Sequence, residues 1–128
     1  MRVRSLMLLL LMLHGLGGTE RLRAELRLSE VLFINVSGPE DSDGEMSPWV
    51  EIINTDNSPI GIENFYLTDD PDDLTKWRIP RKTVAGNGRS LVYLSGKGGM
   101  TLLGNEVHSD FKFTGQDDYL ALVRPDGV

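Results

Sequence analysis

The stretch Trp49-Val50-Glu51-Ile52-Ile53, or WVEII at residues 49–53, decides the fold of this chain. Side chains of a β-strand point alternately to two faces, so Val50 and Ile52 share one face and Glu51 lies on the other. Tryptophan, valine and isoleucine favour extended backbone. The stretch therefore predicts a β-strand with one face turned to a hydrophobic core.

Similar short stretches recur along the chain and favour an all-β fold. The segments between them are rich in Gly, Asn, Asp, Ser and Pro, which favour turns, and no window after residue 24 has a helical apolar period. Apolar, β-branched or aromatic stretches occur at 28–36, 65–67, 77–79, 91–94, 111–113 and 119–123. The pattern predicts one all-β domain, an immunoglobulin-like antiparallel β-sandwich.

The N-terminal residues are typical of a secretory signal peptide. Arg2 and Arg4 precede an apolar run at 6–13, and small residues follow it. The run is shorter than the about 20 residues that a membrane-spanning helix needs. We predict a signal peptide over 1–24, cleaved after Gly17 or Ala24, and an exported domain over 25–128. The expected location is secreted or in the cell envelope, without membrane insertion once the signal is removed.

Charge and cysteine content exclude several classes of function. The 128 residues carry a net charge of -6, and from residue 25 onward 9 basic and 18 acidic residues give -9. Such an acidic domain repels nucleic acid and anionic lipid surfaces. Without cysteine no disulfide can brace the domain, so its stability depends on the core. The length suffices for one domain.

The C-terminal residues predict that the domain continues in a longer protein. The stretch 119–123 has the composition of a strand, and Arg124-Pro125-Asp126-Gly127 is a turn sequence of the kind found between strands. We therefore expect one or two closing strands, and further domains, beyond residue 128. A sandwich without those strands would expose an edge and favour pairing with another chain.

Seven segments together resemble a known family. They are SEV at 29–31, WVEIIN at 49–54, FYLTDD at 65–70, TKWRIP at 75–80, LVYLSGK at 91–97, HSDFKF at 108–113 and DYLALV at 118–123. Their order resembles the bacterial branch of the lamin tail domain family, whose members are immunoglobulin-like sandwiches in exported proteins. The likeness spans residues 28–128. It departs at 85–90, where the usual aromatic anchor before the fifth strand is absent, and the family's closing strands are missing.

The resemblance implies a non-catalytic module that binds a partner or spaces other domains of a larger envelope or extracellular protein. Two alternatives remain open. One is an accessory domain of an exported enzyme, for example one like the spore-coat kinases, with its catalytic part beyond residue 128. The other is a calcium-dependent adhesion module.

One acidic stretch is the strongest candidate for a binding site. The carboxylates of Asp69, Asp70, Asp72 and Asp73 are of the kind that bind calcium, yet the spacing of an EF-hand is not met. Asp70-Pro71 also begins a turn, in which aspartate side chains cap backbone N–H groups. We expect Lys76 and Arg78 to offset the charge. We assign no metal site, keep these four aspartates as the calcium alternative, and predict that the six residues contact a protein or glycan.

The remaining candidates favour structural roles. We interpret the acidic residues 40–45 as a solvated loop, Trp77 as a core residue and Gly96-Lys97-Gly98-Gly99 as a hairpin tip, because the phosphate-binding pattern is absent. His108 is interpreted as a strand-edge residue, and no Gly-x-Ser-x-Gly motif accompanies it. The sequence thus predicts no catalytic residue and no cofactor, and it places the contacts at 69–73 and 76–82.

Overall fold

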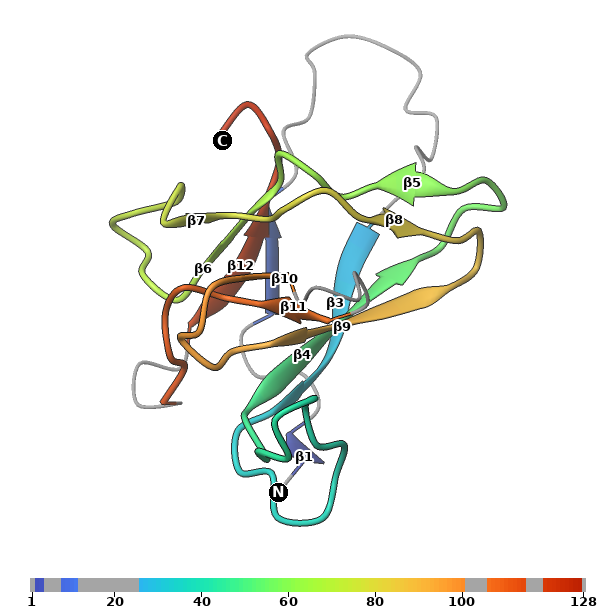
Figure 1. The fold of residues 1–128 in the computed structure, drawn as a ribbon. Helices are drawn as coiled ribbons and strands as arrows, with labels where there is room; N and C mark the ends of the chain where they lie inside the picture. The colour runs from blue at the N-terminus through green and yellow to red at the C-terminus, as the bar shows by residue number, and fades with distance from the viewer. Residues whose placement is uncertain (1, 4–7, 12–25, 101–105, 115–118, 128) are drawn as a thin grey trace, which may run out of the picture.

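The computed structural model describes residues 2–3, 8–11, 26–100, 106–114 and 119–127, and these residues form strands, turns and loops without any helix (Figure 1). Within this part of the chain there is accordingly no helix that could span a membrane. The strands are β1 (Arg2–Val3), β2 (Leu8–Leu11), β3 (Leu26–Leu32), β4 (Trp49–Asn54), β5 (Ile60–Gly61), β6 (Tyr66–Thr68), β7 (Trp77–Arg78), β8 (Thr83–Val84), β9 (Arg89–Tyr93), β10 (Gly99–Met100), β11 (Val107–His108) and β12 (Leu120–Val123).

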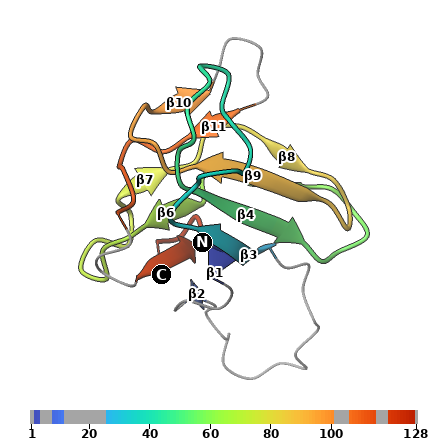
Figure 2. The same ribbon diagram turned by 90° about the horizontal axis from the view of Figure 1, so that it is seen from below.

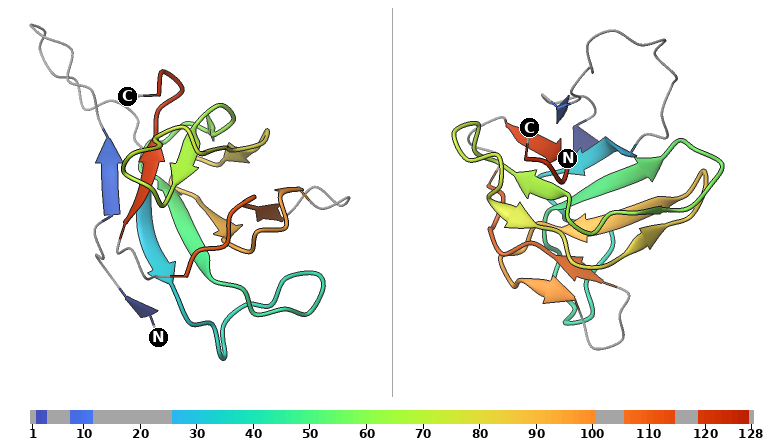
Figure 3. Two further views of the ribbon diagram at one scale, coloured as in Figure 1. Left: turned by 90° about the vertical axis from the view of Figure 1, so that its left-hand side faces the viewer. Right: turned by 90° about the horizontal axis from the view of Figure 1, so that it is seen from above.

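Two sheets enclose one main core, which confirms the predicted all-β sandwich. The larger sheet has the order β1-β3-β4-β9-β11-β10 and the smaller has the order β2-β12-β6-β7, while β5 and β8 form a separate pair. The layers are visible in the right-hand view of Figure 3. Most pairings are antiparallel as predicted, but β11 pairs with β9 and β2 with β12 in parallel. Parallel neighbours need a crossover connection, and the chain between β9 and β11 provides one that also carries β10.

Strand β4 has the two faces that its sequence predicts. Val50 and Ile52 are fully buried in the main core, whereas Trp49 packs on the opposite face with Leu32 and Tyr93. Glu51 lies on that second face too, where its Oε1 accepts a hydrogen bond from the Ser29 hydroxyl at 2.7 Å. The alternation of strand residues therefore decides which side chains form the core.

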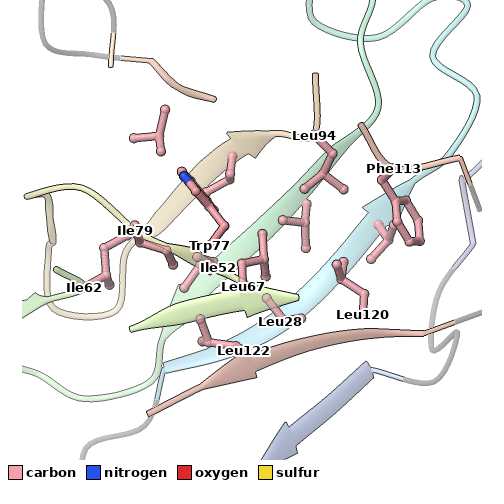
Figure 4. Close-up of a cluster of buried hydrophobic side chains, with 14 of the residues drawn as sticks. Leu28, Ile52, Ile62, Leu67, Trp77, Ile79, Leu94, Phe113, Leu120 and Leu122 are labelled. Atoms are coloured by element: carbon pink, nitrogen blue, oxygen red, sulfur yellow. The ribbon is translucent and has the colours of Figure 1, made fainter. Parts of the chain in front are cut away.

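The core fills the space between the two sheets. Leu67, Leu120 and Leu122 of the smaller sheet pack with Leu28 and Ile52 of the larger one (Figure 4). Burying a leucine side chain contributes about 1.5–3 kcal/mol to folding. Trp77 belongs to the same cluster and is 7% exposed, so its predicted core position is confirmed.

Two predicted strands end differently in the structure. The strand predicted over 28–36 stops at Leu32, because the buried amide of Asn35 turns the chain by donating to the carbonyls of Pro39 and Ser47. The stretch 111–113 was also predicted as a strand, but it forms only a single β-bridge, between Lys112 and Ser95. Its phenylalanine rings are nevertheless buried, so apolar character alone suggested a strand there.

The first two strands lie within the predicted signal peptide. Strand β1 pairs with β3 at one edge of the larger sheet, and β2 pairs with β12 at one edge of the smaller sheet (Figure 3, left). The predicted cleavage positions after Gly17 and Ala24 lie outside the described residues. The signal peptide therefore stays a prediction.

Candidate functional site

The acidic stretch forms a capped turn between β6 and β7. The fully buried Thr68 hydroxyl donates to the carbonyl of Asp73 at 2.6 Å and accepts from the N–H of Asp70 at 3.0 Å. The Asp70 carboxylate accepts from the N–H of Asp72 at 2.9 Å, and that of Asp73 accepts from the N–H of Thr75 at 3.3 Å. These bonds are the aspartate turn chemistry that the sequence predicts.

One of the two predicted cations forms an ion pair with this loop. The Lys76 ammonium lies 2.6 Å from Asp69 Oδ1 and 5.1 Å from the centre of the Phe111 ring. The hydrogen bond with Asp69 raises the pKa of Lys76, and nearby aspartates add to this effect. Arg78 instead donates a hydrogen bond to the side-chain oxygen of Asn64, and its expected part in offsetting the charge of the loop stays a prediction.

The calcium alternative finds no arrangement of ligands to support it. Among the residues that the structure describes, no three His, Cys, Asp or Glu side chains are placed to hold a metal ion. Calcium takes six to eight oxygen ligands. In the acidic loop, one oxygen each of Asp70 and Asp73 is bonded to a backbone N–H and one oxygen of Asp69 to Lys76. The geometry is that of a turn.

A second acidic cluster surrounds Lys97. Its ammonium lies 2.6 Å from Asp41 Oδ2, 2.7 Å from Asp43 Oδ2 and 3.2 Å from Glu45 Oε2. The other oxygen of Asp41 accepts from the N–H groups of Asp43 at 3.0 Å and Glu45 at 2.9 Å. The interpretation as a solvated loop fits the exposed Asp43 and Glu45 but is wrong for Asp41, whose side chain is fully buried.

The surroundings of Asp41 and Lys97 shift the pKa values of both groups in the direction that favours their charged forms. Burial acts to raise the pKa of Asp41, but the hydrogen bonds from Lys97 and from two backbone N–H groups outweigh it, so the pKa lies below its ordinary value. The hydrogen bonds to Asp41 and Asp43 raise the pKa of Lys97. Burying a charged carboxylate costs free energy, and pairing with a cation together with full hydrogen bonding offsets this cost.

A network beside this cluster contains a serine, a histidine and a glutamate. Ser95 Oγ lies 2.8 Å from His108 Nδ1, and His108 Nε2 lies 3.7 Å from Glu106 Oε1. The Glu106 carboxylate also accepts from the N–H of Ser42 at 2.7 and 2.8 Å. The histidine is buried and stacks on Tyr93, with ring centres 5.2 Å apart. Its prediction as a strand-edge residue is wrong, because β11 lies between β9 and β10.

The hydrogen bonds of this network join separate segments of the fold. Ser95 Oγ also accepts from the N–H of Lys97 at 3.2 Å, so each polar atom of the serine and the glutamate has a partner within the fold. A serine nucleophile needs a base together with donors aimed at the developing oxyanion.

The hydrogen bonds of Ser95 also fix the loop 96–99. The prediction that this loop is a hairpin tip is wrong, because β11 lies between β9 and β10.

The two acidic loops do not combine into one site. The loop 69–73 lies between β6 and β7, and the loop 41–45 lies between β3 and β4; Figures 1 and 2 both place them on different sides of the molecule. The segment 76–82 begins shortly after the first loop; its Trp77 and Ile79 are buried, and its Arg78 and Arg81 are exposed. The two predicted contact elements are therefore close together in the sequence, and their role in binding stays a prediction.

Comparisons with known proteins provide no relative. No family model, no curated protein and no solved structure matches this chain. The likeness to lamin tail domains therefore rests on the sequence segments, and any function must be argued from the geometry of the loops and edges.

Proposed function

We propose that this chain is an exported, non-catalytic module of the lamin-tail, immunoglobulin-like type, which binds a partner or spaces domains of a larger envelope or extracellular protein. The observation that carries the proposal is the acidic turn. Its backbone is fixed by the buried hydroxyl of Thr68, while Asp72 and Asp73 are exposed. A preorganised loop loses less conformational entropy when it binds, and loops on a rigid frame commonly carry recognition.

The charge of the surface indicates the chemistry of the partner. The exposed Asp72 and Asp73 suit a protein surface that carries lysine or arginine, and the exposed Arg78 and Arg81 suit acidic groups, including those of a glycan. Complementary charges raise the association rate and the specificity of binding more than its affinity. We expect a partner with a basic patch opposite the acidic turn.

A role without catalysis agrees with the partners of the polar residues. Ser95, His108 and Glu106 are bonded to one another or to backbone groups that hold the loops. Their bonds join the loop before β4 to β9 and β11, which stabilises the frame on which the acidic turn is displayed.

The test has two parts. The first is N-terminal sequencing of the mature protein from the producing cells, which should begin after Gly17 or Ala24; a protein that keeps Met1 would contradict removal of a signal peptide. The second is saturation binding of the labelled protein to isolated envelopes of the same cells. We expect the pair Asp72→Asn and Asp73→Asn to weaken this binding about tenfold, a loss equal to about 1.4 kcal/mol.

A matched pair controls for the change in total charge. Glu40 and Asp110 are also exposed, and the pair Glu40→Gln and Asp110→Asn changes the net charge by the same amount. This control should bind like the unchanged protein. Equal weakening by both pairs, or binding that does not saturate, would show that the acidic turn is not the contact surface.

A further inference from the structure

The loop between β3 and β4, residues 33–47, carries exposed apolar side chains. Among the residues that the structure describes, the large apolar side chains that are exposed all belong to this loop: Ile34 is 60% exposed, Val36 71% and Met46 41%. Single exposed apolar residues are common on protein surfaces, whereas a group of them with polar neighbours marks an interaction site. Their concentration in one loop therefore indicates a role for this surface.

A buried amide brings these three side chains together. Asn35 and Ser47 are both buried, and the side-chain N–H of Asn35 donates to the carbonyl of Ser47 at 3.1 Å. This bond holds the two ends of the loop against each other. Ile34 and Val36 flank Asn35, and Met46 precedes Ser47. The exposed apolar side chains therefore lie on adjacent stretches of chain and form one surface.

Further bonds fix the loop in this shape. The side-chain N–H of Asn35 also donates to the carbonyl of Pro39 at 2.8 Å. The Tyr93 hydroxyl, from β9, donates to the carbonyl of Glu40 at 2.9 Å. The ion pairs of Lys97 hold the second half of the loop. A surface that is ordered before it binds loses less conformational entropy on binding.

The charge around the apolar side chains indicates the chemistry of the partner. Residues 33–47 include four acidic residues and no lysine or arginine. The exposed Asp43 and Glu45 share the single ammonium of Lys97 with Asp41, so negative charge is in excess there. A second copy of this chain would bring the same acidic loop, and like charges across an interface disfavour such pairing. An anionic lipid surface would be repelled as well.

We propose that the loop 33–47 is a docking surface for a partner protein that presents apolar side chains flanked by lysine or arginine. The apolar centre of this surface consists of Ile34, Val36 and Met46, and its acidic rim consists of Asp43 and Glu45. Protein interfaces have this arrangement, in which an apolar centre is surrounded by a polar rim that contacts solvent. Methionine suits such a centre because its flexible side chain adapts to the partner.

This surface is separate from the features described above. Figure 1 and the left-hand view of Figure 3 place the loop at the opposite end of the molecule from the turn 124–127, after which we expect the closing strands to begin. Figures 1 and 2 place the acidic turn on another side. The proposal therefore stands even if the contact proposed for the acidic turn fails.

Three short fluorescent peptides test this chemistry on the full chain. One alternates leucine with lysine, one leucine with glutamate, and one serine with lysine; fluorescence anisotropy measures their binding. We expect the leucine–lysine peptide to bind saturably and about tenfold more tightly than either of the others. If the serine–lysine peptide binds as tightly, charge alone acts; if the leucine–glutamate peptide does, the rim selects no basic partner. Either result would overturn the proposal.

A matched pair of variants locates the binding. Val36→Thr with Met46→Gln keeps the approximate size of both side chains and removes their apolar character, so it should weaken binding of the leucine–lysine peptide about fivefold. The control Ile53→Thr with Leu91→Gln makes the same kind of change at half-buried residues of β4 and β9, and should bind like the unchanged protein. Equal weakening by the two pairs would overturn the proposal.

A second control separates this surface from the acidic turn. Asp72→Asn with Asp73→Asn should bind the leucine–lysine peptide like the unchanged protein. If this pair alone loses binding, the peptide binds at the acidic turn and the proposal made here is wrong.

The remaining outcomes also decide. A dimer in sedimentation that Val36→Thr with Met46→Gln dissociates would assign the surface to a second copy of this chain. Binding to neutral phosphatidylcholine vesicles that the same pair abolishes would assign it to lipid, and both results would overturn the proposal. If that pair does not fold, judged by circular dichroism, Val36→Thr alone should weaken peptide binding about twofold, because Val36 is the most exposed of the three side chains. No loss would overturn the proposal.

Discussion

Replacing Asp41 with alanine tests whether the Lys97 cluster stabilises the fold. The substitution removes a fully buried carboxylate, which bonds two backbone N–H groups and one ammonium. Lys97 keeps Asp43 and Glu45 as partners, so no cation is left alone. The loss is therefore confined to the three bonds of Asp41 itself.

The expected cost follows from these bonds. A hydrogen bond to a charged group contributes about 1.5–3 kcal/mol, and water can partly replace the carboxylate at the N–H groups, whose bonds to Asp41 are only partly buried. We expect Asp41→Ala to lower the free energy of unfolding by about 3 kcal/mol. Asp41→Asn keeps an oxygen for the N–H groups of Asp43 and Glu45 but loses the charge that attracts Lys97, so its cost should be about 1–1.5 kcal/mol.

Urea unfolding followed by tryptophan fluorescence measures these differences. The matched control is Asp43→Asn, since the Asp43 side chain contacts the same ammonium but is 67% exposed. Exposed ion pairs contribute at most about 1 kcal/mol, and we expect about 0.5 kcal/mol or less here. If Asp41→Asn and Asp43→Asn cost the same, the reasoning that burial gives this carboxylate its importance is wrong.

Three further predictions concern the core, a loop contact and pH. Leu67→Ala should lower the free energy of unfolding by about 2–5 kcal/mol in urea, because this fully buried side chain lies between the sheets; a cost under about 1 kcal/mol would contradict the packing. Gly86→Ala should lower the melting temperature in calorimetry, because the added Cβ would collide with the carbonyl of Asn57. Gly44→Ala is the comparison: its Cβ would have open space around it, so it tests the effect of a positive φ alone. The fold lowers the pKa of Asp41 from its ordinary value of 3.8, so the stability that its charged form contributes is present above that pH and is lost as the pH falls through the folded pKa. The Asp41→Asn variant should therefore lose less stability than the unchanged protein in an acid titration. The same pH profile for both proteins would count against the lowered pKa.

The sequence predicted those features that depend on residues close together in the chain. The period of two in Trp49 to Ile53 identifies the buried face of β4, and Asp70-Pro71 identifies the turn after β6. Both signals are local, because strand alternation and turn capping involve neighbouring residues. The all-β class follows from repeating these signals along the chain.

The features that were missed depend on distant or isolated residues. Lys97 is separated from Asp41 by 56 positions, and nothing in the glycine-rich stretch around it indicates which carboxylates it will meet. The D-x-D-G-E pattern of residues 41–45 is a local signal for a turn, with Gly44 at positive φ, but not for its cation. Strands of two residues, such as β11, are too short for any period, so the burial of His108 had no local signal.

The position of β12 has a consequence for the order in which the domain can assemble. This strand lies between β2 and β6, so it joins residues 8–11 and 66–68 through residues 120–123. A chain emerging from the ribosome therefore cannot complete this order of strands until residues 120–123 have been synthesised. Until then the side chains of Leu28 and Ile52 lack two of the residues that pack in the same core, Leu120 and Leu122.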